Sequence, residues 1–388
     1  MMRSTDGTPD LASDPTIRRI LIIKWSAMGD VVLATALMED IRRAFPSASL
    51  HLNTLPPFRR LFAHDPRFAE VIAIDVRRKP GRLAANLEWL RRVRVGRYDL
   101  IIDLQRTDHS RALLALLRLS GGAPRHRLGN RGGFPYSQTP AITDPRAHAL
   151  PMMRSVLRSA GIPCLTPHPV LNPAPSDIEA AMQCMREHGL IPGRFAVFLP
   201  GSQAAGRLKR WGVERYSALA RGMIDSGLID QVALVGGPDE VEDCRRIATS
   251  GAGILNLNGG LDLLQIAPLC AEARLIVGND TGTAHIAAAA GTPMLVLCGA
   301  TDPRRVLPFG PRVRGLQAQV SCRNCYAKAC TQAEPVLCMQ GLTPEFVLEE
   351  VRAMLVGHEN MHPGEWPILR VTWSANAEIQ PRISGGPS

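Results

Sequence analysis

The sequence has few aromatic residues and no long apolar run. Phe, Trp and Tyr make up 5% of the 388 residues, and they are not interleaved with the arginines, so a stacking platform for nucleic acid is poorly supported. No apolar run approaches the roughly 20 residues that a membrane-spanning helix needs. Residues 1–16 are polar and acidic, without the apolar core of a secretory signal. We therefore expect a protein that stays in the cytoplasm.

Two common nucleotide-binding motifs are also missing. No G-x-G-x-x-G follows the first predicted strand, which argues against a dinucleotide-dependent oxidoreductase. Residues 201–208 have the glycine spacing of a P-loop, but they lack the lysine and the Ser/Thr that would bind phosphate and magnesium. A nucleotide triphosphatase is therefore disfavoured.

Size and composition indicate a globular protein of two domains. At 388 residues the chain can form two domains of ordinary size, each with its own core. The hydrophobic fraction of 45% and the charged fraction of 21% are typical of soluble proteins. Because the nine cysteines come without an export signal, they favour free thiols or a metal site over a disulfide framework.

The net charge of +10 calls for an acidic partner or surface. Many of the basic residues gather in one stretch: Arg77, Arg78, Lys79, Arg82, Arg91, Arg92, Arg94 and Arg97. Nucleic acid and a phosphorylated glycolipid on the inner face of a membrane are both candidate partners. Equally, these arginines could simply be solvated side chains on helix faces.

The first half of the chain alternates short apolar runs with helix-length segments. Residues 18–25, 50–54, 71–75 and 98–104 are the predicted strands, and residues 31–45 are a predicted helix that ends before Pro46. This alternation predicts a parallel sheet with helices on both faces. We expect residues 1–17 to be a disordered N-terminus and residues 18–162 to form the first domain.

A proline-rich segment separates the two halves. Residues 163–175 contain five prolines and are expected to link the domains. After a predicted helix at residues 176–188, the alternation restarts with predicted strands at 195–199, 232–235, 254–257, 275–277 and 294–298. We expect residues 176–356 to form the second domain and residues 357–388 to be a tail.

The segment from residue 277 to 293 has the pattern of a strand, a tight turn and an alanine-rich helix. Such a turn presents free backbone N–H groups and the positive end of the helix dipole to an anion. His285 lies four residues after Thr281, so the two side chains would share one face of the helix. The pattern suggests a phosphorylated ligand. The alternative is structural, with Asp280 or Thr281 capping the helix and His285 in the core.

Asp30 is the first candidate for chemistry in the first half. It lies just beyond the first predicted strand, at a helix start. A carboxylate there could remove a proton from a hydroxyl within hydrogen-bond reach. It could also be a helix N-cap with no role in chemistry.

Two motifs resemble a known family. Asp280-Thr-Gly-Thr-Ala-His285, followed by alanines and Gly-Thr-Pro293, resembles the nucleotide-sugar-binding signature of the heptosyltransferase-type glycosyltransferases, family 9 of the inverting enzymes. Lys24-x-x-x-Met-Gly-Asp-Val-Val32 resembles the family's N-terminal signature, and the resemblance extends from about residue 18 to residue 352. It implies an α/β fold of the GT-B type, with two Rossmann-like domains whose parallel sheets face a central cleft.

The resemblance also implies roles for particular residues. Asp30 would be the general base and Lys209, in a Lys-x-Trp motif, would stabilise the leaving diphosphate in place of a metal ion. The implied donor-binding residues are Ser202, Glu240, Asp280, Thr281, Gly282 and His285. By the same resemblance, Asp103, in an Asp-x-Gln segment, would contact the acceptor. Arg77, Arg78 and Lys79 are expected to bind the acceptor because of their positive charge. Leu33 and Arg106 depart from the family pattern, which often has His and Gly there.

Four cysteines near the end of the second half form a separate candidate site. Cys322, Cys325, Cys330 and Cys338 could hold one structural zinc ion, although a second C-x-x-C is missing. Unligated thiols are the alternative. A redox role is disfavoured, because the C-x-x-C does not open a helix in a thioredoxin-like context.

These observations lead to one principal hypothesis. The chain is expected to be an inverting glycosyltransferase that moves a heptose or related sugar from an ADP-sugar to a lipopolysaccharide-core or similar glycolipid acceptor. It would need no catalytic metal, bind no nucleic acid and contact the inner membrane surface peripherally. Two alternatives stay open: a nonenzymatic sugar-nucleotide or nucleic-acid binding protein, and an epimerase or hydrolase of the same architecture that acts on the donor alone.

Overall fold

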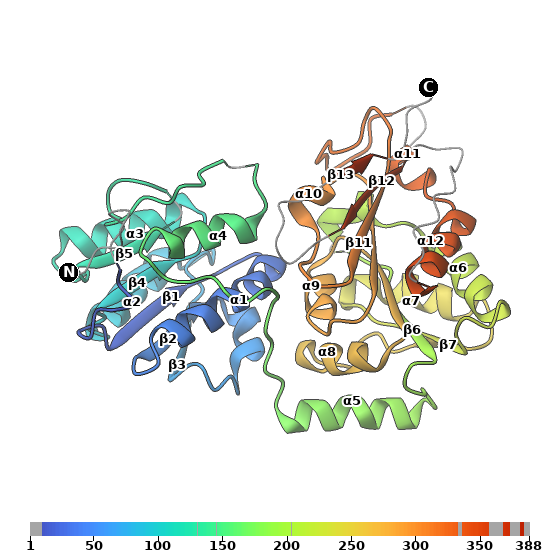
Figure 1. The fold of residues 1–388 in the computed structure, drawn as a ribbon, viewed down its shortest axis with the longest axis horizontal. Helices are drawn as coiled ribbons and strands as arrows, with labels where there is room; N and C mark the ends of the chain where they lie inside the picture. The colour runs from blue at the N-terminus through green and yellow to red at the C-terminus, as the bar shows by residue number, and fades with distance from the viewer. Residues whose placement is uncertain are drawn as a thin grey trace. The chain divides into compact units, whose positions relative to one another are not determined.

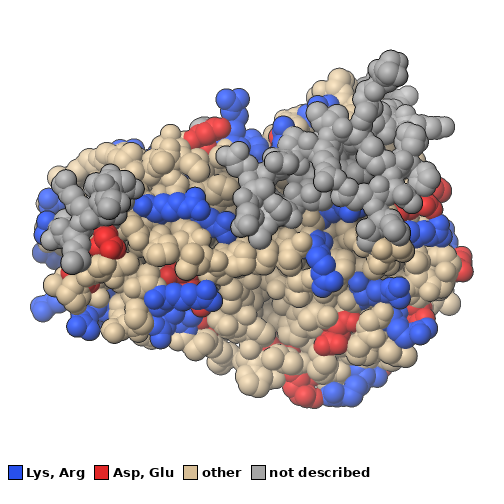
Figure 2. Space-filling view, viewed as in Figure 1, with Lys and Arg blue, Asp and Glu red and all other residues tan. Residues whose placement is uncertain are grey.

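A computed structural model describes residues 10–129, 131–144, 146–202, 204–332, 336–356, 368–372 and 381–383. The chain divides into two compact units, Met1–Asn172 and Pro173–Ser388, each built on its own β-sheet (Figure 1). Basic side chains are visible on the surface of both units (Figure 2). Among the described helices, none has the length and apolar character needed to cross a membrane.

The first unit contains a parallel sheet in the strand order β3-β2-β1-β4-β5. The strands are β1 Arg19–Ile23, β2 Ser49–Thr54, β3 Glu70–Ala73, β4 Leu100–Asp103 and β5 His126–Gly129. The order reverses at β1, which pairs with β2 on one side and β4 on the other. In open parallel sheets, this reversal marks the place where the loops after the strands form a binding site.

Helices connect the strands of the first unit. They are α1 Met28–Ala44, the 3₁₀ helix η1 Pro56–Phe62, α2 Arg82–Val95, α3 Asp108–Leu119 and α4 Ala149–Arg158. Trp89 of α2 and Leu113 of α3 share one core cluster with Leu21 of β1 and Ile101 of β4. Because that cluster contacts both helices, α2 and α3 cover the same face of the sheet.

A buried asparagine organises the polar contacts in this core. Asn53 Oδ1 accepts hydrogen bonds from the indole N–H groups of Trp25 at 2.6 Å and Trp89 at 2.7 Å. Its amide nitrogen donates to the carbonyl of Ile72 at 2.9 Å. Each buried donor is therefore satisfied, which avoids the cost of burying an unpaired polar group.

The second unit contains a larger sheet in the order β13-β12-β11-β10-β9-β6-β7-β8. The strands are β6 Phe195–Leu199, β7 Gln231–Leu234, β8 Ile254–Asn256, β9 Leu275–Asn279, β10 Met294–Cys298, β11 Val313–Ala318, β12 Ile368–Thr372 and β13 Pro381–Ile383. The strands from β6 to β11 pair in parallel, whereas β12 and β13 are antiparallel additions at one edge.

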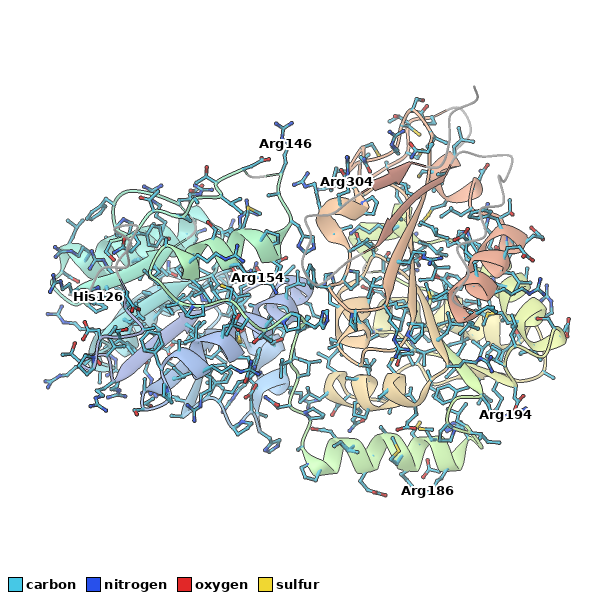
Figure 3. The ribbon with its side chains drawn as sticks, in the orientation of Figure 1. His126, Arg146, Arg154, Arg186, Arg194 and Arg304 are labelled. Carbon is cyan, nitrogen blue, oxygen red and sulfur yellow. The ribbon has the colours of Figure 1, made fainter. Side chains whose placement is uncertain are left out.

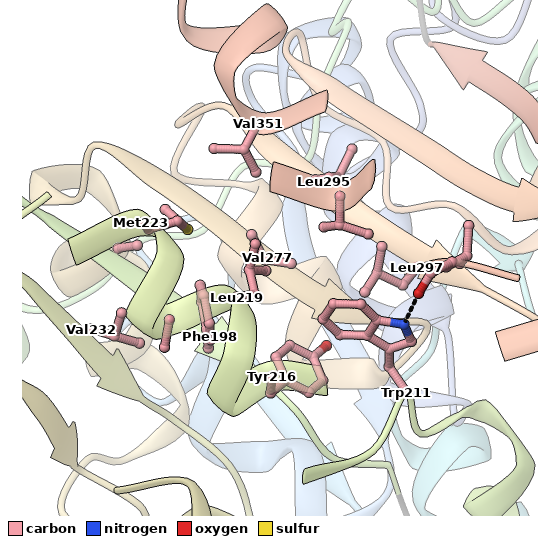
Figure 4. Close-up of a cluster of buried hydrophobic side chains, with 14 of the residues drawn as sticks. Phe198, Trp211, Tyr216, Leu219, Met223, Val232, Val277, Leu295, Leu297 and Val351 are labelled. Carbon is pink, nitrogen blue, oxygen red and sulfur yellow. Dashed lines mark hydrogen bonds between the residues drawn. The ribbon is translucent and has the colours of Figure 1, made fainter. Parts of the chain in front are cut away.

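Helices of the second unit bury the large side chains of its core. They are α5 Pro175–Glu187, η2 Ala204–Lys209, α6 Val213–Asp225, η3 Pro238–Glu240, α7 Val241–Ala248, α8 Leu263–Glu272, α9 Gly282–Ala288, α10 Pro303–Val306, α11 Leu337–Gln340 and α12 Pro344–Val356. Trp211 is fully buried beside Tyr216, and its indole N–H donates to the Leu342 carbonyl at 2.7 Å (Figure 4). This bond anchors the segment that follows Lys209 to the core.

The proline-rich segment belongs largely to the first unit. The chain divides after Asn172, inside residues 163–175. Thr166 donates to Asp40 through its backbone N–H at 2.8 Å and its hydroxyl at 2.6 Å. Arg154 of α4, labelled in Figure 3, donates to the Thr166 carbonyl at 2.8 Å, and the N–H of Val170 donates to Thr35. These bonds hold the segment against the unit that it leaves.

Both chain ends differ in part from the expectation. Leu11 and Ile17 are buried, and the N–H of Leu11 donates to the Ala160 carbonyl at 3.0 Å, so the prediction of disorder is wrong for residues 10–17. Within the predicted tail, β12 extends the sheet by pairing with β11, and β13 pairs with β12. Residues 1–9, 357–367, 373–380 and 384–388 lie outside the described part of the chain.

Candidate functional site

In the first unit, the candidate site begins at the turn between β1 and α1. Asp30 is the third residue of α1, and its side chain is 40% exposed. Ala27 occupies the N-cap position and makes no side-chain capping bond, so the interpretation of Asp30 as an N-cap is wrong. Asp30 instead lies in the first turn, where a carboxylate complements the helix dipole. Its exposed carboxylate can also accept a proton from a ligand.

A buried lysine lies next to Asp30. Lys24 Nζ is 3.4 Å from Asp30 Oδ2 and donates to the Ser26 carbonyl at 2.9 Å. Burial lowers the pKa of Lys24, while the Asp30 carboxylate opposes that shift. The pair orients the Asp30 side chain relative to the turn.

Two further side chains fix the turn from neighbouring loops. Gln105 Oε1 accepts from the N–H of Trp25 at 2.9 Å and of Ser26 at 3.0 Å. Arg77 Nη1 donates to the Ser26 hydroxyl at 2.9 Å. The structure therefore brings Arg77 to the turn that carries Asp30. Gln105 was not among the predicted site residues, although the Asp-x-Gln segment contains it.

Arg78 and Lys79 lie at the same edge of the first sheet as the turn that carries Asp30. They are exposed in the loop between β3 and α2, beyond the carboxyl end of a strand that runs parallel to β1. Loops after parallel strands share one edge of the sheet. Their predicted contact with an acceptor stays a prediction.

Asp103 does not fit the predicted role in acceptor binding. It is fully buried, accepts from the Tyr136 hydroxyl at 2.6 Å and accepts from the N–H of Gln105 at 2.9 Å. At the end of β4, the Asp103 side chain turns into the core. The prediction that it contacts the acceptor directly is therefore wrong for this conformation. Asp103 positions Gln105, which in turn holds the turn of Asp30.

Asp103 should make stability depend on pH. Burial raises its pKa from 3.8 to about 6. Between these values the folded chain keeps a proton on Asp103 that the unfolded chain has lost, so the contribution of Asp103 to the free energy of unfolding should fall as pH rises from about 4 to 6. The change corresponds to about 3 kcal/mol. Urea unfolding followed by tryptophan fluorescence should detect it, and Asp103→Asn should remove it.

The matched control for this measurement is Asp108→Asn. The Asp108 side chain is exposed in the first turn of α3. Its replacement should leave the pH dependence as in the parent chain. Equal pH profiles for the Asp103 variant and the parent would contradict the assignment to Asp103.

In the second unit, Lys209 and Asp280 meet at the carboxyl edge of the sheet. Lys209, at the end of η2, donates to Asp280 Oδ2 at 2.8 Å, and the Thr301 hydroxyl donates to the same oxygen at 3.0 Å. Asp280 is buried, whereas the Lys209 side chain is 32% exposed. The ammonium group is therefore held in place, and part of the lysine side chain stays exposed.

Asn279 supports this pair and was not among the predicted site residues. It ends β9, is fully buried and donates to the Pro200 carbonyl at 2.6 Å. Its Oδ1 accepts from the Tyr216 hydroxyl at 3.1 Å. These bonds connect the end of β9 with the loop after β6.

Glu240 connects the loops after β6 and β7. Its carboxylate accepts from the N–H of Gly237 at 2.5 Å, and the side chain is buried against Gly201. A Cβ at position 201 would lie 1.6 Å from Glu240 Cγ. The carboxylate is therefore positioned by its own turn and by the absence of a side chain at 201.

The remaining predicted donor residues have local partners. Thr281 caps α9 by accepting from the N–H of Ala284 at 3.2 Å, so the structural alternative of a helix cap is confirmed for this residue. Gly282 begins α9, and His285 is buried within it. Ser202 is buried and donates to the Gly206 carbonyl at 2.7 Å, within its own loop. A phosphate contact by Ser202 stays a prediction.

The four candidate zinc ligands do not form a metal site in the described geometry. Cys322, Cys325, Cys330 and Cys338 are all described and free. Burial, together with the negative charge of the neighbouring thiols, raises the pKa of Cys338 to about 11. Among the described residues, however, no group of three or more His, Cys, Asp or Glu is arranged to hold a metal ion. A zinc ion at these four cysteines stays a prediction.

Comparison with known proteins identifies the family. The family model "Glycosyltransferase family 9 (heptosyltransferase)" matches residues 87–335. This span contains Lys209, Glu240 and Asp280, which line the carboxyl edge of the second sheet. The chain belongs to glycosyltransferase family 9. As a member of this family, it is a glycosyltransferase enzyme.

Curated relatives extend the likeness over more of the chain. Lipopolysaccharide heptosyltransferase 2 of Escherichia coli (strain K12) is 27% identical over 359 residues, covering 88% of this chain and 99% of the relative. Lipopolysaccharide heptosyltransferase 1 of Pseudomonas aeruginosa is 27% identical over 375 residues, with the same two coverages. Both likenesses extend beyond the span matched by the family 9 model.

Solved structures bear out the GT-B fold. A family 9 glycosyltransferase from Veillonella parvula has a TM-score of 0.73 and 18% identity, covering 88% of this chain and 97% of its own. The Escherichia coli ADP-heptose LPS heptosyltransferase II has a TM-score of 0.67 and 23% identity, covering 88% and 100%. The prediction of two Rossmann-like domains is confirmed.

Proposed function

We propose that this family 9 glycosyltransferase is an inverting heptosyltransferase. It moves a heptose, or a related sugar, from an ADP-sugar to a lipopolysaccharide-core or similar glycolipid acceptor. The observation that carries the proposal is the Lys209–Asp280 pair, a partly exposed cation fixed at the edge of a sheet in a sugar-nucleotide-binding fold. The names of the curated relatives support heptose as the sugar.

The donor assignment rests on the second unit. Two solved structures of Escherichia coli heptosyltransferase WaaC, 22–23% identical to this chain, are described as containing ADP and ADP-2-deoxy-2-fluoro heptose. In this chain, Glu240 offers a carboxylate that can accept hydrogen bonds from ribose hydroxyls. Lys209 offers positive charge to the diphosphate. Thr281, Gly282 and His285 belong to the same proposed donor site, with Ser202 in the loop after β6.

The reaction assigns a proton acceptor to the first unit. Asp30 removes the proton of the acceptor hydroxyl as that oxygen forms a bond to the anomeric carbon. The bond from the anomeric carbon to the diphosphate oxygen breaks, and its electrons leave with ADP. Attack from the face opposite the diphosphate inverts the anomeric centre.

The leaving group is stabilised by the second unit. Negative charge develops on the diphosphate as the glycosidic bond breaks, and a fixed ammonium group lowers the energy of that state. Lys209 supplies this charge in the proposed mechanism, so no catalytic metal is assigned. Asp280, which itself accepts a hydrogen bond from Thr301, keeps the lysine in place before the donor arrives.

The acceptor side of the proposal rests on charge. Arg77, Arg78 and Lys79 lie at the edge that carries Asp30, where acidic sugars or phosphates of a glycolipid could bind. We assign the enzyme to the cytoplasm, in peripheral contact with the cytoplasmic face of the inner membrane, and assign it no nucleic-acid partner.

Calorimetric titration with ADP, ADP-heptose, UDP and GDP tests the donor assignment. In buffer containing EDTA, ADP and ADP-heptose should bind at least tenfold more tightly than UDP and GDP. A preference for UDP or GDP would contradict the ADP-sugar donor. Release of free or epimerised sugar from ADP-heptose at full rate without acceptor would instead favour a hydrolase or epimerase.

A further inference from the structure

The outward face of α2 carries a line of exposed apolar side chains. Leu83, Leu87 and Val95 are 74%, 57% and 66% exposed. Leu87 lies four residues after Leu83, and Val95 lies eight residues after Leu87. Arg91 lies midway between Leu87 and Val95. Residues spaced by four share one face of a helix. The opposite face of α2 is the one that packs into the core through Trp89 and Val93.

The neighbouring helix α3 has the same character. Leu116 and Leu119 are 53% and 75% exposed, and Ala112 is exposed one turn earlier. The inner side of α3 joins the core cluster that contains the inner side of α2, and the two helices contact each other. Their outer faces therefore form one continuous surface of the first unit, which we call the α2/α3 face.

Positive charge accompanies this apolar surface. Residues 77–97 contain eight Arg and Lys and one acidic residue, Glu88, so their formal charge is 8 − 1 = +7, compared with +10 for the whole chain. Arg92 is paired with Glu70. Arg78, Lys79, Arg82, Arg91, Arg94 and Arg97 form no ion pair within the part of the chain that the structure describes. Their charge is available to an anionic partner.

Exposed leucines bordered by unpaired arginines fit one kind of partner best. An interfacial helix inserts its apolar side chains at the boundary between lipid headgroups and acyl chains, while its arginines contact anionic headgroups. The guanidinium groups can also reach the surface while their stems pack on apolar side chains. A nucleic acid fits less well, because Trp89 is buried and no aromatic side chain of α2 or α3 is exposed for stacking.

We propose that the α2/α3 face docks the enzyme on an anionic lipid bilayer. Leu83, Leu87 and Leu119 enter the headgroup region, and Arg91 and Arg94 contact lipid phosphates. The inference rests on the proposed function in one respect: a glycolipid acceptor is found in such a bilayer. Beyond the proposed function, the inference names the α2/α3 face as the surface that contacts the membrane.

The position of α2 gives the docking a consequence for the reaction. The helix begins directly after the loop of Arg77, and Arg77 bonds to the turn that carries Asp30. The first turn of the docking helix is thus continuous with the edge where the acceptor is proposed to bind. A lipid-anchored acceptor could reach this edge without leaving the bilayer.

Vesicle sedimentation with the full chain tests the proposal. The parent protein should bind vesicles of phosphatidylcholine with about 30% phosphatidylglycerol at least tenfold more tightly than vesicles of phosphatidylcholine alone. The triple variant Leu83→Ser, Leu87→Ser, Leu119→Ser should lose at least tenfold in binding to the anionic vesicles. Arg91→Gln with Arg94→Gln should lose the preference for anionic lipid.

The matched control replaces exposed apolar residues elsewhere. Ile191 and Val241, in the second unit, are 54% and 52% exposed, and their replacement by serine should leave vesicle binding unchanged. Circular dichroism and ADP titration check that each variant is folded. Vesicle binding by both α2/α3 variants at the parent level would overturn the proposal.

Two further outcomes separate this proposal from its alternatives. A parent protein that dimerises through this face, becomes monomeric in the triple variant and binds no vesicles would overturn membrane docking in favour of a second copy of the chain. If ADP does not bind but the triple variant loses vesicle binding, the proposed donor is wrong and the docking surface stands.

Discussion

Replacing Asp30 by asparagine should lower kcat for sugar transfer by a factor of about 10²–10⁴, the usual contribution of a positioned general base. Asparagine keeps the size of the side chain and an oxygen near Lys24, so the turn should keep its shape. Because Asp30 belongs to the first unit and the proposed donor residues to the second, ADP affinity should stay within about twofold of the parent value. Single-turnover kinetics with ADP-heptose and a glycolipid acceptor measure the effect.

A matched change on the same helix provides the control. Glu39 lies nine residues after Asp30 in α1 and pairs with Arg43. Glu39→Gln makes the same chemical change without touching the turn, so kcat should remain near the parent value. Parent-level turnover by the Asp30 variant would remove Asp30 from the mechanism.

Replacing Lys209 by methionine should produce the second large effect. Methionine keeps most of the apolar stem but removes the charge, and loss of one fixed electrostatic stabiliser costs a factor of about 10²–10³ in kcat. Affinity for ADP should also fall, because the diphosphate loses a cation. Among the described residues, Thr301 is then the hydrogen-bond donor that Asp280 keeps. Calorimetry with ADP and steady-state kinetics separate the two losses.

Lys328 offers the comparison for this variant. It is the other lysine of the second unit and is exposed. Lys328→Met changes net charge by the same amount, so a general electrostatic effect would appear in both variants, whereas a local one would appear only at position 209. Equal kcat values for the two variants would reject the stabilising role of Lys209.

The strands of both sheets could largely be predicted, because their apolar runs are bounded by glycine, proline or polar residues. Residues 195–199 and 275–277 illustrate this, since both lie in strands that are buried throughout. β5 was missed because only one of its four residues, Leu128, is a large apolar residue. Its Arg127 is buried through hydrogen bonds to the Pro135 carbonyl and others, which are tertiary contacts that no local pattern reveals.

The residues of the candidate site that belong to sequence motifs could be predicted. The residues that hold the site in position through tertiary hydrogen bonds could not. The motifs contain Lys209 and Asp280, which the structure brings into contact. Gln105 and Asn279 act on backbone groups about 80 residues away in the sequence, so their roles appear only in three dimensions. Asp103 was misassigned because its position at a strand end does not tell whether the side chain turns to the core or to the solvent.

The contact between Gly201 and Glu240 has a consequence for interpreting natural variation in this gene. Gly201 has no side chain with which to bind the substrate, yet even a methyl group there would overlap the Glu240 side chain. Glu240 would have to move, and with it the carboxylate proposed to bind the ribose. A missense change at codon 201 should therefore impair nucleotide binding as a change in the nucleotide pocket does. A survey that considers only ligand-contacting positions would predict no effect for such a change.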